Sequence, residues 1–368
     1  EEIRAVVIES GVTSVNSYAF AACYNLETAV IPDSVTEISG WAFNGCENLS
    51  QVSLPATAVL GVNAFAKCTG VRTVKLTGTG DMVYYRALAG GNHIPWGVST
   101  QEVTVELADG VTSISVGAFR SCGALSEIVI PDSVSLIGEE AFYESGLKRV
   151  AIPDSVAEIG KYAFFGCKSL EEISLPVNLE WPTGCFTGCT AIKNVKLTGE
   201  GAMPLRASNS TPWSVGSEAG NQVTVEVGNG ITELYGFSGC TGLTKVVLPP
   251  SAVIGMDEFS GCTGLEQITI PEGVESIGSN AFRNCKSLRS IELPDSVTEV
   301  GDGAFQGCSS LESVPLPHGL KKISYRLFSG CTSLSEMRIP DGVTAINGYA
   351  FQGCTALERI VVPGSVTY

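Results

Sequence analysis

Apolar and polar positions alternate in short runs that recur along the chain every 22 or 23 residues. In residues 265–287 one such run places Ile268 and Ile270 on one face and Thr269 on the other, as in a half-buried strand. Pro271 ends the run because it cannot donate to a continuing ladder, and the Glu-Gly pair after it favours a turn. A second apolar pair predicts a return segment, and an Ala-Phe pair predicts a short helical or 3-10 turn.

Phenylalanine marks the period of the pattern. Consecutive copies are 22 or 23 residues apart, except at two gaps of 54 and 51 residues. This period lies in the leucine-rich-repeat range, and a unit of this length cannot bury its apolar face alone. Stacked units therefore predict one α/β repeat solenoid over residues 1–368, with a parallel sheet and about 15 coils. The repeat residues are Phe20, Phe43, Phe65, Phe119, Phe142, Phe164, Phe186, Phe237, Phe259, Phe282, Phe305, Phe328 and Phe351.

Cysteine follows the same period, since 12 of the 13 Cys residues stand three positions after a repeat Phe. A disulfide framework needs partners and a zinc site needs closely spaced ligands, and this spacing offers neither. We interpret the residues as a stacked column of small buried thiols. Cys185, which replaces the Ala of an Ala-Phe pair, also reads as core, and Ser145 takes the thiol position in one coil.

The two long gaps predict atypical coils around residues 77–102 and 198–222. Each contains a Met, a Pro-Trp pair and a re-entry strand of the form Val-Thr-Val-Glu. One interpretation is that Trp and Met replace the missing Ala-Phe pair in the core. The other is that residues 81–95 and 202–212 form excursions that contact a partner. The first excursion would supply three candidate contacts, Tyr84, Tyr85 and His93.

The repeat consensus resembles a known family. The pattern Leu-x-x-Ile-x-Ile-Pro-x-x-Val-x-x-Ile-Gly-x-x-Ala-Phe-x-x-Cys, at residues 265–285 and with one Val for Ile at 288–308, is similar to the BspA-type leucine-rich repeat. The resemblance covers nearly the whole chain. It implies a right-handed superhelix on the surface of host-associated anaerobic bacteria, with adhesion to a host or microbial protein or glycan. It brings no catalytic residues with it.

Composition and charge limit the partners and activities that we expect of the chain. A net charge of −16 repels phosphate backbones, so nucleic acid is not expected as a partner, and no apolar run is long enough for a membrane helix. Only two His residues occur, His93 and His318, which leaves little material for a His-based triad or a His-rich metal site. The recurrent Asp of Pro-Asp-Ser is expected to cap its own turn rather than to bind a cation. We therefore expect no enzyme, cofactor or metal.

The residue between the two inward positions of each strand should face outward, and these residues form the outward column. The column is chemically mixed and has no aromatic side chain, which argues against a sugar-stacking platform. Its members are Val7, Val30, Ser53, Lys75, Glu106, Val129, Ala151, Ser174, Lys196, Glu226, Val247, Thr269, Glu292, Pro315, Arg338 and Val361. From it we take as candidate partner contacts Lys75, Glu106, Lys196, Glu226, Thr269, Glu292 and Arg338.

Two functions remain open. One is a monomeric, non-enzymatic adhesion module that recognises a protein or glycan at the cell surface or outside the cell. The other is a passive stalk that presents another domain of a larger surface protein. The chain begins at Glu1 without a leader and ends inside a new repeat, so we expect more protein beyond it.

Overall fold

The computed structural model describes residues 3–83, 94–182, 184–203, 211–218 and 220–367. The chain forms a parallel β-solenoid of about 15 coils with very little helix, which confirms the predicted fold class. It comprises two compact units, the first Glu1–Ser174 with Leu179–Ala191 and the second Leu175–Asn178 with Ile192–Tyr368.

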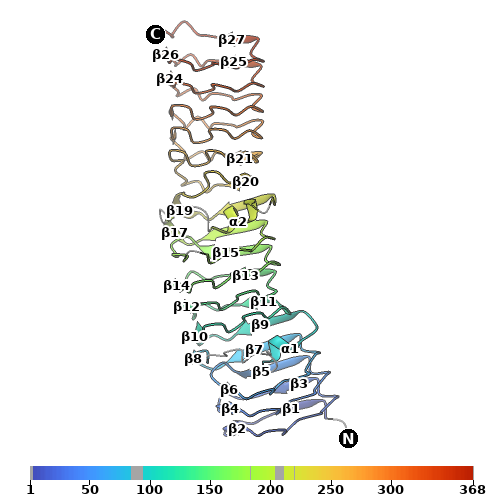
Figure 1. Ribbon diagram of the computed structural model, residues 1–368. Coiled ribbons are helices and arrows are strands. Elements are labelled where there is room, and N and C mark those ends of the chain that lie inside the picture. The colour runs from blue at the N-terminus through green and yellow to red at the C-terminus, as the bar shows by residue number, and fades with distance from the viewer. Residues whose placement is uncertain (1–2, 84–93, 183, 204–210, 219, 368) are drawn as a thin grey trace. The chain divides into compact units, whose positions relative to one another are not determined.

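In the first unit each regular coil contributes one strand to a main ladder and one to a return ladder (Figure 1). The main ladder contains β1 (Ala5–Val7), β3 (Thr28–Val30), β5 (Gln51–Pro55), β7 (Thr73–Thr77), β9 (Val103–Leu107), β11 (Leu125–Val129), β13 (Arg149–Ala151) and β15 (Glu172–Pro176). The return ladder consists of two separate sheets. One contains β2 (Ser14–Val15), β4 (Glu37–Ile38) and β6 (Val59–Leu60), and the other contains β8 (Gly80–Asp81), β10 (Val111–Ile114), β12 (Leu136–Ile137) and β14 (Glu158–Ile159). The short helix α1 (Pro95–Val98) precedes β9.

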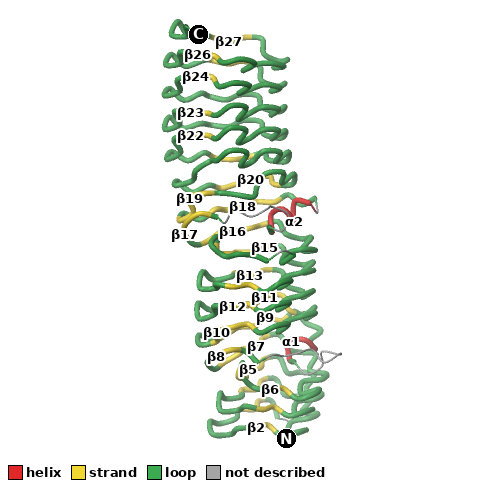
Figure 2. Tube along the Cα trace, turned by 60° about the vertical axis from the view of Figure 1, so that its left-hand side comes forward, coloured by secondary structure: helices red, strands yellow, loops and turns green. Residues whose placement is uncertain are grey.

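The second unit repeats this plan. Its main strands are β16 (Asn194–Thr198), β18 (Val223–Val227), β20 (Leu243–Val247), β21 (Gln267–Thr269), β25 (Glu336–Arg338) and β27 (Arg359–Val361). Its return strands are β17 (Glu200–Ala202), β19 (Gly230–Glu233), β22 (Ser276–Ile277), β23 (Glu299–Val300), β24 (Lys322–Ile323) and β26 (Ala345–Ile346). Helix α2 (Pro212–Glu218) is coloured red in Figure 2, where most of the trace is loop and strand.

The interior of each unit is built from stacked aromatic rings. The Phe43 ring lies with its centroid 5.1 Å from those of Phe20 and Phe65. At the two Pro-Trp pairs a fully buried tryptophan takes the place of Phe, since the Trp96 ring lies 5.4 Å from Phe119 and the Trp213 ring 5.1 Å from Phe237. Met82 and Met203 are buried as well. For these side chains the core-filling interpretation of the atypical coils is therefore correct.

The Ala-Phe segment forms consecutive hydrogen-bonded turns rather than a 3-10 helix. Around Phe43, the flanking residues Trp41 and Gly45 have φ angles of 58° and 80°, in the left-handed region. A run of right-handed helical residues cannot pass through such positions, so the segment turns twice. The same pair of positions is left-handed around Phe20, Phe65, Phe119, Phe142, Phe164, Phe186, Phe259, Phe282, Phe305, Phe328 and Phe351. Because it recurs in these coils, this geometry belongs to the fold and not to a functional site.

The predicted thiol column is confirmed, and the structure shows why the position suits cysteine. Eleven Cys residues are buried, and Cys23 and Cys354 are half-buried. In regular coils the thiol donates a hydrogen bond to the Phe carbonyl of the preceding coil, as from Cys308 Sγ to Phe282 O at 3.0 Å. A thiol is small enough for the core and still offers a weak donor. The Phe282 carbonyl also accepts from the backbone N–H of Cys285 at 3.1 Å, so the thiol adds a second donor to the same oxygen and links the two coils.

Candidate functional site

The outward column lies on the sheet face, the outer surface of the main ladder. Lys75 is exposed between Val74 and Leu76, which are fully buried, and β7 follows the inside-outside alternation along its length. The other column residues are exposed as well, apart from two half-buried serines. The predicted orientation of the column is therefore correct, and side chains there can change without disturbing the core.

Four of the candidate contacts form two pairs of neighbours. In the first unit Lys75 of β7 is in register with Glu106 of β9. In the second unit Lys196 of β16 is in register with Glu226 of β18, and their side chains form an ion pair of 3.5 Å. Both partners of that pair are more than half exposed, and exposed ion pairs contribute about 0–1 kcal/mol. All four side chains are thus exposed on the sheet face.

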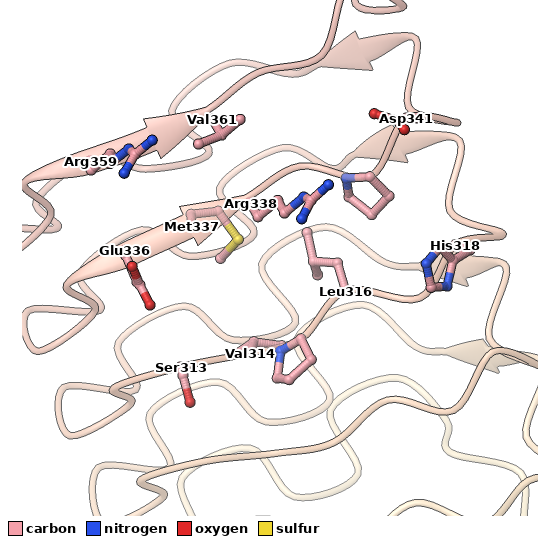
Figure 3. Close-up of a pocket in the computed structure, with 12 residues that line it drawn as sticks. Ser313, Val314, Leu316, His318, Glu336, Met337, Arg338, Asp341, Arg359 and Val361 are labelled. Carbon is pink, nitrogen blue, oxygen red and sulfur yellow. The ribbon is translucent and has the colours of Figure 1, made fainter.

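Three further candidates, Thr269, Glu292 and Arg338, line hollows on the sheet face of the second unit. Hollows of about 360, 830 and 600 Å³ follow one another between residues 245 and 361. The first two share lining residues 267–269, and the last two share residues 315, 316 and 318. The three hollows therefore adjoin one another in a row, and we call this row the sheet groove. Figure 3 shows its last hollow. The predicted contacts Tyr84, Tyr85 and His93 lie outside the described residues.

The groove also includes residues that the alternation pattern did not single out. Leu316, His318 and Arg359 line the last hollow. His318 Nδ1 lies 3.0 Å from Asp295 Oδ1, and the His318 backbone N–H donates to the same oxygen at 3.1 Å. The hydrogen bond with the His318 ring has the larger effect and that with the backbone N–H the smaller one, and both lower the pKa of Asp295. Position along the strand could have indicated Arg359, since it stands two residues before Val361 and so shares its face.

The Pro-Asp-Ser turns differ from the expectation that Asp caps its own turn. Asp33 accepts a hydrogen bond from Thr77 Oγ1 at 2.6 Å and Asp295 binds His318, so both reach other coils. The backbone closes the turn itself, as from Val297 N–H to Pro294 O at 3.0 Å. The Ser hydroxyl donates to the preceding coil, as from Ser296 Oγ to Val274 O at 2.7 Å. These turn residues thus join coils to one another.

The thiols of the column are poor candidates for nucleophiles. Burial raises the pKa of Cys122 and of Cys308 to about 12, so these groups are neutral at physiological pH. Contact with Cys46 together with burial also raises the pKa of Cys68. Among the residues that the structure describes, no group of three or more His, Cys, Asp or Glu side chains could hold a metal ion. In the same part of the chain no helix is long and apolar enough to span a membrane.

Comparison with protein families decides the relationship. The model of the BspA type leucine rich repeat region matches in 6 copies, over residues 1–93, 99–202 and 252–368. The chain belongs to the BspA type leucine-rich-repeat family. The matched ranges leave out residues 94–98 and 203–251, which include α1, α2 and both Pro-Trp pairs. Leucine-rich-repeat solenoids of this kind are typically non-catalytic scaffolds that bind protein ligands.

Two solved structures illustrate the similarity. A leucine-rich repeat protein from Bacteroides ovatus is 25% identical, with a TM-score of 0.43, and the alignment covers 98% of this chain and 82% of that one. A leucine rich cell surface protein from Faecalibacterium prausnitzii is 23% identical, with a TM-score of 0.32 and coverage of 100% and 83%. A search of curated proteins finds no match.

Proposed function

We propose that this BspA-type chain is a non-enzymatic adhesion module that acts at the cell surface or outside the cell and binds a protein partner through the sheet groove. The observation that carries the proposal is the groove itself, a row of adjoining hollows along residues 245–361. A long shallow surface with varied side chains on a regular frame suits recognition of another macromolecule better than turnover of a small substrate. We further propose that residues 1–368 act as one monomeric module.

The chemistry of the groove favours a protein over a neutral glycan. Its described lining combines apolar side chains such as Ile270 and Leu316 with charged ones such as Glu292 and Arg338, and the ring of His318 is its one aromatic side chain. Sugar rings stack on exposed aromatic faces, whereas protein interfaces mix an apolar centre with a polar rim. Lys75, Glu106, Lys196 and Glu226 remain proposed contacts on the same face.

A blocking experiment tests this proposal. The wild-type chain is first measured against immobilised host-matrix, mucin and microbial surface proteins. The double variant Thr269→Arg, Glu292→Arg fills the groove with two long side chains at exposed positions. The matched control Glu275→Arg, Ser276→Arg makes the same charge change at exposed positions of the return ladder.

We expect the groove variant to bind its ligand at least tenfold more weakly, equivalent to about 1.4 kcal/mol, while the control stays close to wild type. Equal losses in both variants, or none in either, would place recognition on another surface. If the wild type binds no protein of the panel, the passive-stalk hypothesis replaces adhesion.

A further inference from the structure

Two arginines stand side by side at the last hollow of the sheet groove. Arg338 lies on β25 and Arg359 on the adjacent parallel strand β27, where Arg338 is in register with Val361 and Glu336 with Arg359. Alternate residues of a strand share a face, so both guanidinium groups emerge on the sheet face, and both are exposed. They lie diagonally across one pair of strands, within the reach of one extended ligand.

Neither guanidinium is neutralised by a described neighbour. Elsewhere basic side chains pair with a carboxylate one coil away, as Arg149 does with Glu127 at 3.6 Å and Arg289 with Glu312 at 3.5 Å. Among the described residues no carboxylate lies within ion-pair distance of Arg338 or Arg359. Figure 3 shows the carboxylate of Glu336 turned away from Arg359, although the two residues are in register. The chain thus keeps two positive groups unpaired at one place despite its net charge of −16.

Apolar side chains line the hollow beside the two arginines, and Ser313, His318, Glu336 and Asp341 complete its lining. Val314, Leu316 and Val361 line it, and Figure 3 shows Leu316 beside Arg338. An apolar floor reduces the screening of a charge pair by water, and the planar guanidinium group can bind a carboxylate through two parallel hydrogen bonds. The hollow therefore suits a carboxylate that is attached to an extended chain with apolar side chains.

We propose that Arg338 and Arg359 bind an acidic segment of the partner protein, in which carboxylate side chains alternate with apolar ones. The inference rests on the proposed function and names a subsite of the same groove. The carboxylates contact the two guanidinium groups, and the apolar side chains of the segment pack on Leu316 and Val361. A uronate-bearing glycan shares the anionic group but lacks the apolar side chains that this floor would contact.

A direct binding measurement tests the subsite without knowledge of the natural partner. A fluorescein-labelled (Glu-Val)4 peptide is titrated with the full chain and followed by fluorescence anisotropy, with (Gln-Val)4 and (Lys-Val)4 as comparison peptides. The double variant Arg338→Gln, Arg359→Gln removes the subsite. The double variant Arg289→Gln, Lys322→Gln removes the same charge from the same unit at residues that pair with Glu312 and Glu299.

We expect the acidic peptide to bind the wild type, to lose about tenfold in affinity in the subsite variant, and to change less than twofold in the control. Binding should also weaken as the salt concentration rises from about 0.15 to about 0.5 M, since added salt screens the charges. Circular dichroism checks that the variants fold. As an independent readout, Arg338→Glu with Arg359→Glu should reverse the preference toward (Lys-Val)4.

Several outcomes would overturn the proposal: no binding of (Glu-Val)4, equal loss in the control, or a failure of the charge reversal. A hyaluronan octasaccharide that binds at the two arginines while the peptide does not would identify a glycan subsite instead. If the peptide binds as expected but the blocking variants of the groove leave partner binding intact, the adhesion surface is wrong and the subsite stands.

Discussion

The regular coils and the two Pro-Trp coils solve the same packing problem with different side chains. In a regular coil a stacked Phe fills the interior, and a thiol donates to the Phe carbonyl of the preceding coil, as Cys308 does to Phe282 at 3.0 Å. In the Pro-Trp coils an indole fills the interior and its N–H donates to the next coil instead, from Trp96 to Ala118 O at 3.2 Å and from Trp213 to Gly236 O at 2.8 Å.

The thiol ladder changes where the indole takes over. After Trp96 the Cys122 thiol approaches Arg120 O at 3.5 Å, and after Trp213 the Cys240 thiol approaches Gly236 O at 3.8 Å, both within their own coil. In both kinds of coil a turn carbonyl thus accepts a side-chain hydrogen bond from a neighbouring coil, from a thiol in one kind and from an indole in the other. The periodic Cys and Trp therefore serve the fold.

The largest expected effect tests the ring stack of the regular coils. Phe259→Ala should destabilise the chain by about 3–5 kcal/mol, because the fully buried ring lies 5.4 Å from both Phe237 and Phe282. Phe351→Ala should cost less, since this ring is half-buried and stacks on Phe328 alone among the described rings. Urea unfolding measures both. Equal losses with one sharp transition would indicate a globular core rather than stacked coils.

A smaller effect should separate the contribution of the Trp213 N–H from that of the volume of its ring. Trp213→Phe keeps an aromatic ring beside Phe237 but removes the N–H that donates to Gly236 O. Gly236 O would keep only the long contact from Cys240 Sγ at 3.8 Å, and the loss of its good donor should cost about 1–3 kcal/mol, which urea unfolding would detect. The control Trp41→Phe changes an indole that is 37% exposed and should cost less than about 0.5 kcal/mol. If both variants lose the same stability, the indole acts through its volume alone.

One regular coil departs from the rule that buried polar atoms are satisfied. Glu258 stands where other coils have the Ala of Ala-Phe, only 5% of it is exposed, and its Oε1 has no hydrogen-bond partner among the described residues. Burial raises the pKa of Glu258 to about 8. The side chain of an unfolded Glu has a pKa of about 4.3, so the folded chain holds the proton more tightly. The stability from this proton is complete below about pH 4.3 and is lost as the pH rises to about 8.

Glu258→Ala should therefore stabilise the chain at pH 8 by about 1–3 kcal/mol, because it restores the small side chain of this position and removes a buried group without a partner. Between pH 5 and 8, roughly the window in which the wild type loses stability, the variant should show a flatter dependence. Thermal unfolding at several pH values measures this. The control Glu292→Ala changes an exposed carboxylate and should leave the pH dependence unaltered. A wild type whose stability rises across the same window would contradict the prediction.

The smallest expected effect is a difference in stability between variants of two thiols that donate to different acceptors. Cys308→Ala and Cys122→Ala remove the same atoms from buried positions, but only the Cys308 thiol donates to the Phe carbonyl of the preceding coil. The first variant should cost about 1 kcal/mol more, the net value of one hydrogen bond. Cys308→Ser keeps a donor and should recover part of that difference. Equal costs for the two alanine variants would mean that the ladder contributes only packing.

The repeat spacing predicted the fold, the buried thiols and the outward column, because a period of 22 or 23 residues places each side chain in the same environment in every coil. It could not predict the left-handed residues around Phe, since side chains as different as Trp41 and Glu140 occupy that position. It also missed the part of Arg359 and His318 in the groove. Their contribution depends on how neighbouring coils place their turns and strands, which a single repeat does not contain.

The most direct test of the central claim is a hydrogen-exchange footprint of the wild-type chain with the first panel protein that binds it. Our interpretation predicts slower exchange for amides between residues 245 and 361 at the strands and Pro turns that line the sheet groove. The turns around Phe259, Phe282 and Phe305 should exchange as in the unbound chain. Protection confined to those turns, with the groove unchanged, would contradict recognition through the sheet face.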